Sequence, residues 1–287
     1  MSRSGRFGAL AVVGGLTLVA CVPIKAPPTP LPPQLHVAAF GCIGSSELFT
    51  VPAGVIVVYL DTFGAQGGNG RPLANSEGLS GLGGRAAGAF AVTPGEILHV
   101  NVGCRGGDGA SSGPGGIGGF SGPFGDASGG NGGDGVASDE GGGGGGASDV
   151  RRAGSVLVRG GGGGGGGSGD AAMGQDGGDG GDGGGIQGTA GDSTQCAGGA
   201  PGTQDMPGAG GSAAGCADTG DDGHDGIGSR GGEGGEVFDP SGGGGGGGHF
   251  GGGGGAGSGF VAPGVVDPVF ESGVRTGHGL VTITYFA

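Results

Sequence analysis

The sequence predicts a mostly β protein with little or no α-helix, in which long glycine-rich insertions interrupt a small set of strands. Glycine supplies 92 of the 287 residues, but the strict Gly-X-Y period and abundant proline of collagen are missing. Runs of β-branched and aromatic residues, bounded by turn residues, lie at both ends of the glycine-rich region. Such runs are typical of strands, so we expect a β frame that carries the glycine tracts.

The chain opens with the pattern of a secretory signal. Two arginines precede an apolar or small run from Phe7 to Ala20, which is too short to span a bilayer. Leu18-Val19-Ala20-Cys21 resembles the lipobox of bacterial lipoproteins, in which the chain is cut before the cysteine and the thiol is acylated. We expect residues 1–20 to be the signal peptide, and the exported protein to meet the membrane through lipid on Cys21, at the bacterial cell surface or outer membrane. An ordinary secretory signal with an incidental cysteine is the alternative.

The remaining chain divides by composition. Six prolines within residues 22–35 indicate an extended stalk, so residues 21–46 are predicted to be the anchored cysteine and a proline-rich stalk. Residues 47–287 are predicted to form a glycine-rich domain, with its β frame in 47–103 and 278–286 and the glycine tracts between them.

The predicted strands follow from β-branched and aromatic enrichment. Two strand-turn-strand units are expected first, with turns at Pro52-Ala53-Gly54 and Thr93-Pro94-Gly95. The strands are Leu48–Val51, Val55–Leu60, Ala86–Val92, Glu96–Val102, Val156–Val158 and Leu280–Tyr285. Within the fourth strand the alternation places Leu98, Val100 and Val102 on the apolar face.

The glycine tracts 141–146, 160–167, 242–248 and 251–255 leave two structures open. One is disorder, because fixing a glycine backbone costs more entropy than fixing any other and few side chains offset it. The other is a bundle of extended threefold helices of the polyproline-II type, which without Cβ atoms approach closely enough to hydrogen-bond one another. The strands at both ends favour the bundle, because they offer a frame that holds the tracts.

Four cysteines remain once Cys21 is acylated, and an even number in an exported chain indicates two disulfides. Of the three connectivities we favour Cys42–Cys104 and Cys196–Cys216. Loop closure entropy predicts that these bridges stabilise the fold by about 4 and 3 kcal/mol. A cysteine metal site is the weaker interpretation, since no CxxC spacing exists.

Charge and composition exclude several function classes. The formal net charge is −14, and Lys25 is the only lysine. No P-loop lysine, Schiff-base lysine or basic groove is therefore expected, and nucleic acid is not expected as a partner. Gly109-Ala110-Ser111-Ser112-Gly113 fits the nucleophile-elbow pattern but lacks its strand-turn-helix context, and the histidines form no triad with it. We expect no enzymatic activity.

Aspartates supply the main candidate metal ligands. Asp176, Asp179 and Asp182 recur with a period of three, which places their carboxylates on one edge of a threefold helix, where calcium is a candidate ligand. The alternative is a solvated acidic edge. The cluster of Asp218, Asp221, Asp222, His224 and Asp225 has the same two interpretations, and the calcium nonapeptide match in 129–136 has no tandem copy. No other cofactor is expected.

Several motifs resemble the glycine-rich domain found in anaplastic lymphoma kinase and leukocyte tyrosine kinase receptors and in many bacterial surface proteins. The resemblance covers roughly residues 47–286, in order, and its most specific part is Gly143–Arg151 followed by Val156-Leu157-Val158 and a glycine run. Further matches are Phe49–Val55, Gly64–Gly68, Val92–Glu96, Val100–Gly103, His249-Phe250, Gly257–Val261 and Gly279–Tyr285.

The resemblance implies a jelly-roll-like β frame carrying a bundle of polyglycine-II helices. Asp149 and Arg151 in its most specific motif are interpreted as structural ties at a sheet–tract junction, and Phe250 and Phe260 as packing residues between bundle and sheet. Cys104 departs from the family, which usually has glycine there.

The leading functional hypothesis is a non-enzymatic, lipid-anchored surface protein with a structural or adhesive role, which binds an extracellular protein or glycan. Two alternatives are an ice-binding or surface-ordering protein and a calcium-dependent binding module. The first alternative is weakened because the tracts lack a regular threonine or alanine face.

Overall fold

The computed structural model of the chain describes residues 32–71, 78–110, 114–122, 126–135, 140–169, 177–192, 198–212, 221–236 and 241–287. The chain divides into two units, Met1–Pro33 and Gln34–Ala287. The fold described below is that of Gln34–Ala287. Cys21 lies outside the described residues. None of the described residues forms an α-helix, so none forms a helix able to cross a membrane.

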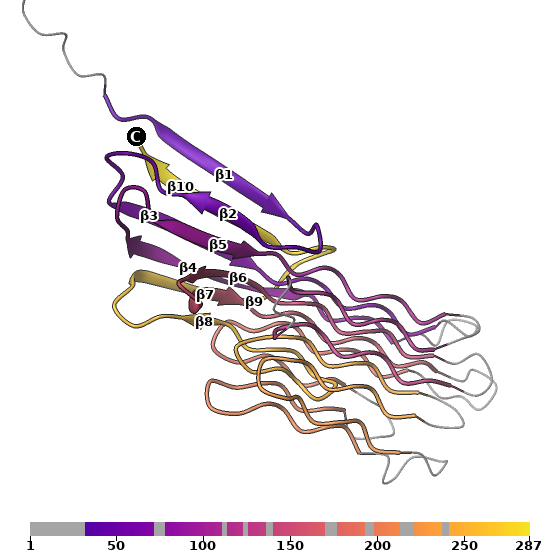
Figure 1. The fold of residues 1–287 in the computed structure, drawn as a ribbon. Helices are drawn as coiled ribbons and strands as arrows, with labels where there is room; N and C mark the ends of the chain where they lie inside the picture. Colours follow the sequence, from indigo (N-terminus) through magenta and orange to yellow (C-terminus); the bar gives the residue numbers. More distant parts are fainter. Residues whose placement is uncertain are drawn as a thin grey trace, which may run out of the picture. The chain divides into compact units, whose positions relative to one another are not determined.

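Ten strands form two antiparallel sheets of five strands each (Figure 1). Sheet A has the order β1-β10-β3-β4-β9 and sheet B the order β2-β5-β6-β7-β8. The strands are β1 Leu35–Gly41, β2 Glu47–Thr50, β3 Val57–Phe63, β4 Gly83–Ala91, β5 Ile97–Asn101, β6 Ser148–Arg152, β7 Ser155–Gly160, β8 Phe260–Val261, β9 Val266–Arg275 and β10 Leu280–Phe286. The predicted mostly β class is confirmed.

The hydrophobic core lies between the two sheets. Alternate residues of β3, among them Val58 and Leu60, are fully buried and meet Leu98 and Val100 of β5 in one cluster. The predicted apolar face of Leu98, Val100 and Val102 is confirmed. Because β2 pairs with β5 and β3 pairs with β4, the turn at residues 52–54 crosses from sheet B to sheet A.

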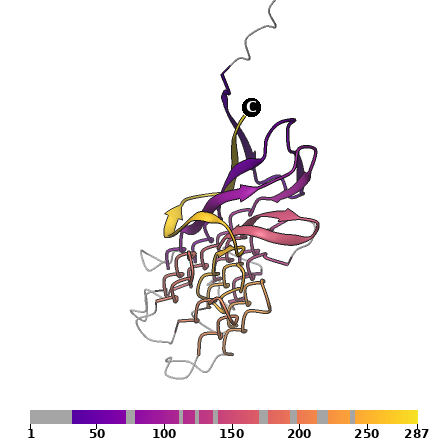
Figure 2. The same cartoon turned by 90° about the vertical axis from the view of Figure 1, so that its left-hand side faces the viewer.

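The glycine-rich segments between the strands pack side by side and extend from one end of the sheets (Figures 1 and 2). We call them the tract bundle; its described segments are 64–71, 78–82, 102–110, 114–122, 126–135, 140–147, 161–169, 177–192, 198–212, 221–236 and 241–259.

Hydrogen bonds in the bundle follow a period of three. Six consecutive N–H groups reach three neighbouring segments in rotation: Gly141 to Gly133, Gly142 to Gly166, Gly143 to Gly107, Gly144 to Gly130, Gly145 to Gly163 and Gly146 to Cys104. Successive donors of a threefold extended helix point in directions 120° apart, so every third residue meets the same neighbour. The bundle, rather than disorder, is therefore the structure of the described tracts.

Close approach of the backbones explains why the tracts are glycine. A Cβ atom on Gly165 would lie 2.0 Å from the carbonyl oxygen of Gly142, and one on Gly162 would lie 2.1 Å from that of Gly145. The nearest atoms all belong to the backbone of the neighbouring segment, so no flexible side chain can move away. Even alanine is therefore excluded at these positions.

Four strands lie outside the predicted set: β1, β6, β8 and β9. β1 falls within residues 21–46, the segment predicted as stalk, and pairs along its whole length with β10. The sheet thus begins at Leu35, twelve residues before the predicted start of the frame at residue 47. β6 follows the glycine tract 141–146, with Ala147 between the last glycine and Ser148, the first residue of the strand.

Candidate functional site

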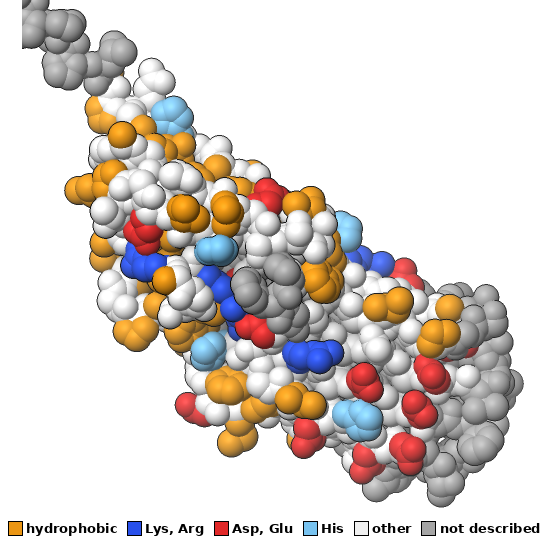
Figure 3. Space-filling view, in the orientation of Figure 1, with side chains coloured by type: hydrophobic (Ala, Val, Ile, Leu, Met, Phe, Trp, Pro, Cys, Tyr) orange, Lys and Arg blue, Asp and Glu red, His pale blue; other side chains and the backbone are white. Residues whose placement is uncertain are grey.

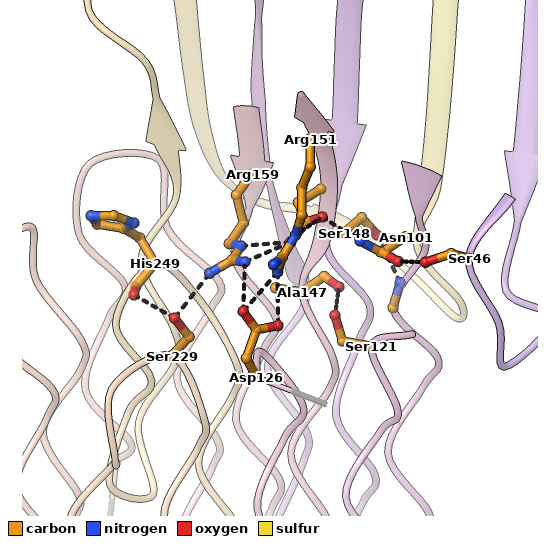
Figure 4. A network of polar contacts seen from close by, with 12 residues as sticks. Ser46, Asn101, Ser121, Asp126, Ala147, Ser148, Arg151, Arg159, Ser229 and His249 are labelled. Atoms are coloured by element: carbon orange, nitrogen blue, oxygen red, sulfur yellow. Dashed lines mark hydrogen bonds and ion pairs between the residues drawn. The ribbon is translucent and has the colours of Figure 1, made fainter. Parts of the chain in front are cut away.

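A buried ionic network joins sheet B to the tract bundle (Figure 4). Asp149 of β6 is fully buried and accepts hydrogen bonds from three side chains. Arg159 of β7 donates at 2.6 and 3.0 Å, Arg151 of β6 at 2.9 and 3.0 Å, and Asn101 of β5 at 2.7 Å. The predicted structural role of Asp149 and Arg151 at the junction agrees with this geometry.

The two arginines carry the network into the bundle. Arg151 Nη2 donates to both carboxylate oxygens of Asp126, at 2.7 and 2.8 Å. Arg159 Nη1 donates to the carbonyl oxygen of Gly248 at 2.9 Å and to Ser229 Oγ at 3.0 Å. Bundle segments far apart in the sequence are thus held against one strand pair.

Charge compensation keeps Asp149 ionised in spite of its burial. Burial raises the pKa of its carboxyl group, but the guanidinium groups of Arg159 and Arg151 and the hydrogen bond from Asn101 outweigh that effect and lower the pKa below its ordinary value. The carboxylates of Asp149 and Asp126 in turn raise the pKa of Arg151 against the effect of its burial. The network is therefore charged and satisfied, and its chemistry is structural.

The aspartates predicted as calcium ligands have backbone partners. Asp179 Oδ1 accepts a hydrogen bond from Leu79 N at 2.7 Å, and Asp182 Oδ1 accepts one from Leu82 N at 2.8 Å. Asp176 lies outside the described residues. The period of three predicted for this edge is thus matched by the spacing of the N–H groups that the two carboxylates meet.

Other side chains at the margins of the bundle act in the same way. Asn131 and Asp134, within the calcium nonapeptide match, accept from Gly118 N at 2.9 Å and Gly115 N at 2.7 Å. Asp225, in the second acidic cluster, accepts from Gly210 N at 2.8 Å. These oxygens accept from N–H groups of outer segments that have no backbone acceptor among the described residues. We call this arrangement edge capping.

The predicted disulfide Cys42–Cys104 is present, with a Cα–Cα distance of 5.3 Å. It links the end of β1 in sheet A to the segment that follows β5 of sheet B into the bundle. Cys196 and Cys216 lie outside the described residues. The ring of His278 lies beside the bridge and accepts a hydrogen bond from Arg105 N at 3.0 Å. In the described part of the chain these two sulfurs and His278 are the one group with the spacing of metal ligands, and the sulfurs are bonded to each other.

An aromatic cluster lies where the final tract returns to the sheets. The ring of His249 stacks on Phe260 of β8 with centroids 4.2 Å apart, and meets Phe250 edge-on at 5.1 Å. Burial and the nearby charge of Arg159 lower the pKa of His249. Phe260 of β8 thus packs at the junction as predicted, through the imidazole of His249, and Phe250 contacts the same imidazole from within the bundle.

Side chains of different kinds occupy different parts of the surface. On the face seen in Figure 3, acidic side chains gather over the tract bundle and hydrophobic ones over the sheets. Single large apolar residues nevertheless project from the bundle, with exposed fractions of 74% for Ile117 and 78% for Ile227. Of the nucleophile-elbow match, Gly109 and Ala110 are described and residues 111–113 lie outside the described part.

No protein-family model and no curated protein matches this sequence. The function is therefore inferred from the fold and the site.

Proposed function

We propose that this protein is a non-enzymatic, lipid-anchored module of the bacterial cell surface or outer membrane, with a structural or adhesive role. It binds an extracellular protein or glycan through the exposed faces of the tract bundle. In this proposal the anchor is the lipid on Cys21, and the domain is related to the glycine-rich domain that its motifs resemble.

The observation that carries the proposal is the rotating hydrogen-bond pattern of residues 141–146. Backbones fixed on three sides hold the outer side chains in set positions, so a partner that binds them loses little conformational entropy in the protein. Ile117 and Ile227 are the most exposed large apolar side chains of the described bundle. Apolar anchors on a rigid, otherwise polar surface are what a protein or glycan partner contacts at the centre of an interface.

Attachment assays test this function. Cells that produce the wild type, a deletion or the Ile117→Ser/Ile227→Ser variant are compared for attachment to surfaces coated with host protein or glycan. We expect the deletion to lose attachment and the double variant to reduce it at unchanged surface abundance. Cys21→Ser separates the anchor from the binding surface, because it releases the protein from the cell while the purified protein still binds. Equal attachment by wild type and deletion would contradict the proposal.

A further inference from the structure

We propose that β1 is a dimerisation edge, which pairs antiparallel with β1 of a second copy of this chain and continues sheet A across a two-fold axis. This inference goes beyond the proposed function and does not depend on the lipid anchor.

The backbone groups on one side of β1 face away from β10 and have no hydrogen-bond partner among the described residues. Gln34 and Ala287 exchange both of their backbone hydrogen bonds, at 2.8 and 3.0 Å. Because hydrogen-bonded pairs alternate along an antiparallel ladder, the groups of residues 36, 38 and 40 face β10. The N–H and C=O groups of residues 35, 37, 39 and 41 therefore point away from it. β1 is the outer strand of sheet A, and no described strand lies beyond it.

The other three sheet edges carry features that discourage pairing. β9, the opposite edge of sheet A, contains Pro268, has a positive φ of 51° at Asp267, and shows two register shifts against β4. In sheet B, β2 has four residues and begins with Glu47, and β8 has two residues. Short length, proline, charge and irregularity are the usual protection of an edge strand.

β1 has none of these protections. Its seven residues, LHVAAFG, include no proline and no Asp, Glu, Lys or Arg, and its register with β10 is continuous. Leu35 and Val37 are 58% and 61% exposed and lie on the outer face of the sheet. An edge that is long, regular, uncharged and apolar on its exposed face is a template for another strand.

A second copy is the occupant that matches β1 in length and register, and β1 is an uncharged edge at which two copies can meet. The chain has a net charge of −14, so two copies repel each other over most approaches. Antiparallel pairing centred on Ala38 would place Leu35 opposite Gly41 and Val37 opposite Ala39, and all of these are uncharged. The outward groups of both strands then meet in register. The segment 22–33 is unsuited to the same edge, because its six prolines have no N–H to donate.

Sedimentation velocity of the chain from residue 22 onward, which includes the whole compact unit, tests the inference. We expect a concentration-dependent monomer–dimer equilibrium for the wild type across the micromolar range. Val37→Lys places like charges on both edges, and Ala39→Pro removes an outward donor from each copy. Each should weaken association by about tenfold or more. Ala38→Pro is the matched control for the fold, because it removes an N–H that faces β10 and should lower the melting temperature, which Ala39→Pro should leave nearly unchanged.

A wild type that stays monomeric throughout, or a dimer that Val37→Lys and Ala39→Pro leave intact, would overturn the inference. So would a monomer whose β1 edge instead takes an extended peptide from another protein. The attachment assay tests Ile117 and Ile227 of the bundle, whereas sedimentation tests β1. Failure of the dimer inference and failure of the proposed function are therefore seen in different experiments.

Discussion

Asp149 and Arg159 lie directly opposite each other on β6 and β7, with Asp149 Oδ2 and Arg159 Nη2 2.6 Å apart and both side chains buried. The same arginine reaches the carbonyl oxygen of Gly248 in the bundle. One cross-strand pair thus bonds a strand of the sheet to a tract that lies 89 residues further along the chain. We infer that the frame and the bundle unfold together.

Replacing Asp149 with asparagine should strongly destabilise the fold. The substitution leaves the buried Arg159 with only Asp126, 3.7 Å away, as counter-charge. Removal of one partner from a buried pair costs about 3–5 kcal/mol. Denaturant unfolding followed by circular dichroism measures the loss. Asp205→Asn is the matched control, because Asp205 is exposed and its substitution should change stability by less than about 0.5 kcal/mol. Equal stability of the two variants would contradict a structural role for the network.

His249 should make the fold sensitive to mild acid. Burial and Arg159 lower its pKa in the folded state, while the unfolded chain keeps the ordinary value of about 6.5. The unfolded state therefore takes up the proton first, and stability should fall as the pH drops from about 6.5 toward the folded pKa. His249→Phe keeps the stacking on Phe260 and removes the titration, so its melting temperature should fall less between pH 7 and pH 5. A parallel pH profile in wild type and variant would refute this.

The parts that could be predicted from sequence depend on local pattern. β3, β5 and β10 have β-branched residues in alternation, and the disulfide joins two cysteines near the predicted strands. β1 was not predicted because Ala38, Ala39 and Gly41 weaken the strand pattern directly after a proline-rich segment. β9 was not predicted because Pro268 and Gly273 interrupt it.

In the ionic network, Asp149 and Arg151 follow a glycine tract directly and were predicted as structural ties, whereas Arg159 and Asp126 have no local pattern that marks them. Their contacts join residues 10 and 25 positions away. Such partners depend on how the tracts cross, and that crossing follows from hydrogen bonds between glycines that are alike in sequence. The edge-capping contact between Asp179 and Leu79, 100 residues apart, is unpredictable for the same reason.

One methyl group in the bundle should be more damaging than one on the sheet edge. Gly165→Ala would place its Cβ 2.0 Å from a carbonyl oxygen, whereas Gly41→Ala meets no atom within 4 Å. Separating the packed backbones breaks hydrogen bonds of about 1 kcal/mol each along the tract. We expect Gly165→Ala to cost several times that amount, or to abolish folding, and Gly41→Ala to change stability by less than about 0.5 kcal/mol. Thermal melts of both variants decide this, and similar melting temperatures would contradict the close packing.

Reduction of Cys42–Cys104 should loosen the junction between the sheets. The bridge spans 62 residues, and loop closure entropy gives it about 4 kcal/mol of stabilisation. The variant Cys42→Ser/Cys104→Ser isolates its effect from that of Cys196 and Cys216. We expect the variant to melt at a lower temperature than the oxidised wild type under the same conditions. An unchanged melting temperature would mean that the hydrogen bonds of β1 to β10 hold that strand without the bridge.

Asp182 provides a test of edge capping against calcium binding, because substitution by asparagine and by alanine separates the two roles. Capping needs an acceptor oxygen for Leu82 N, which Asp182→Asn would keep and Asp182→Ala would lose. Loss of a hydrogen bond to a charged acceptor costs about 1.5–3 kcal/mol, less where solvent reaches it. Asp182→Ala should therefore destabilise the protein without calcium present, whereas Asp182→Asn should retain most of the stability. A calcium site needs the negative charge of the carboxylate. If Asp182 bound calcium, both variants would therefore lose the same stability in calcium, and calcium would raise the melting temperature of the wild type alone. Melts of the three proteins with calcium and with chelator decide between these outcomes, and we expect the pattern of capping.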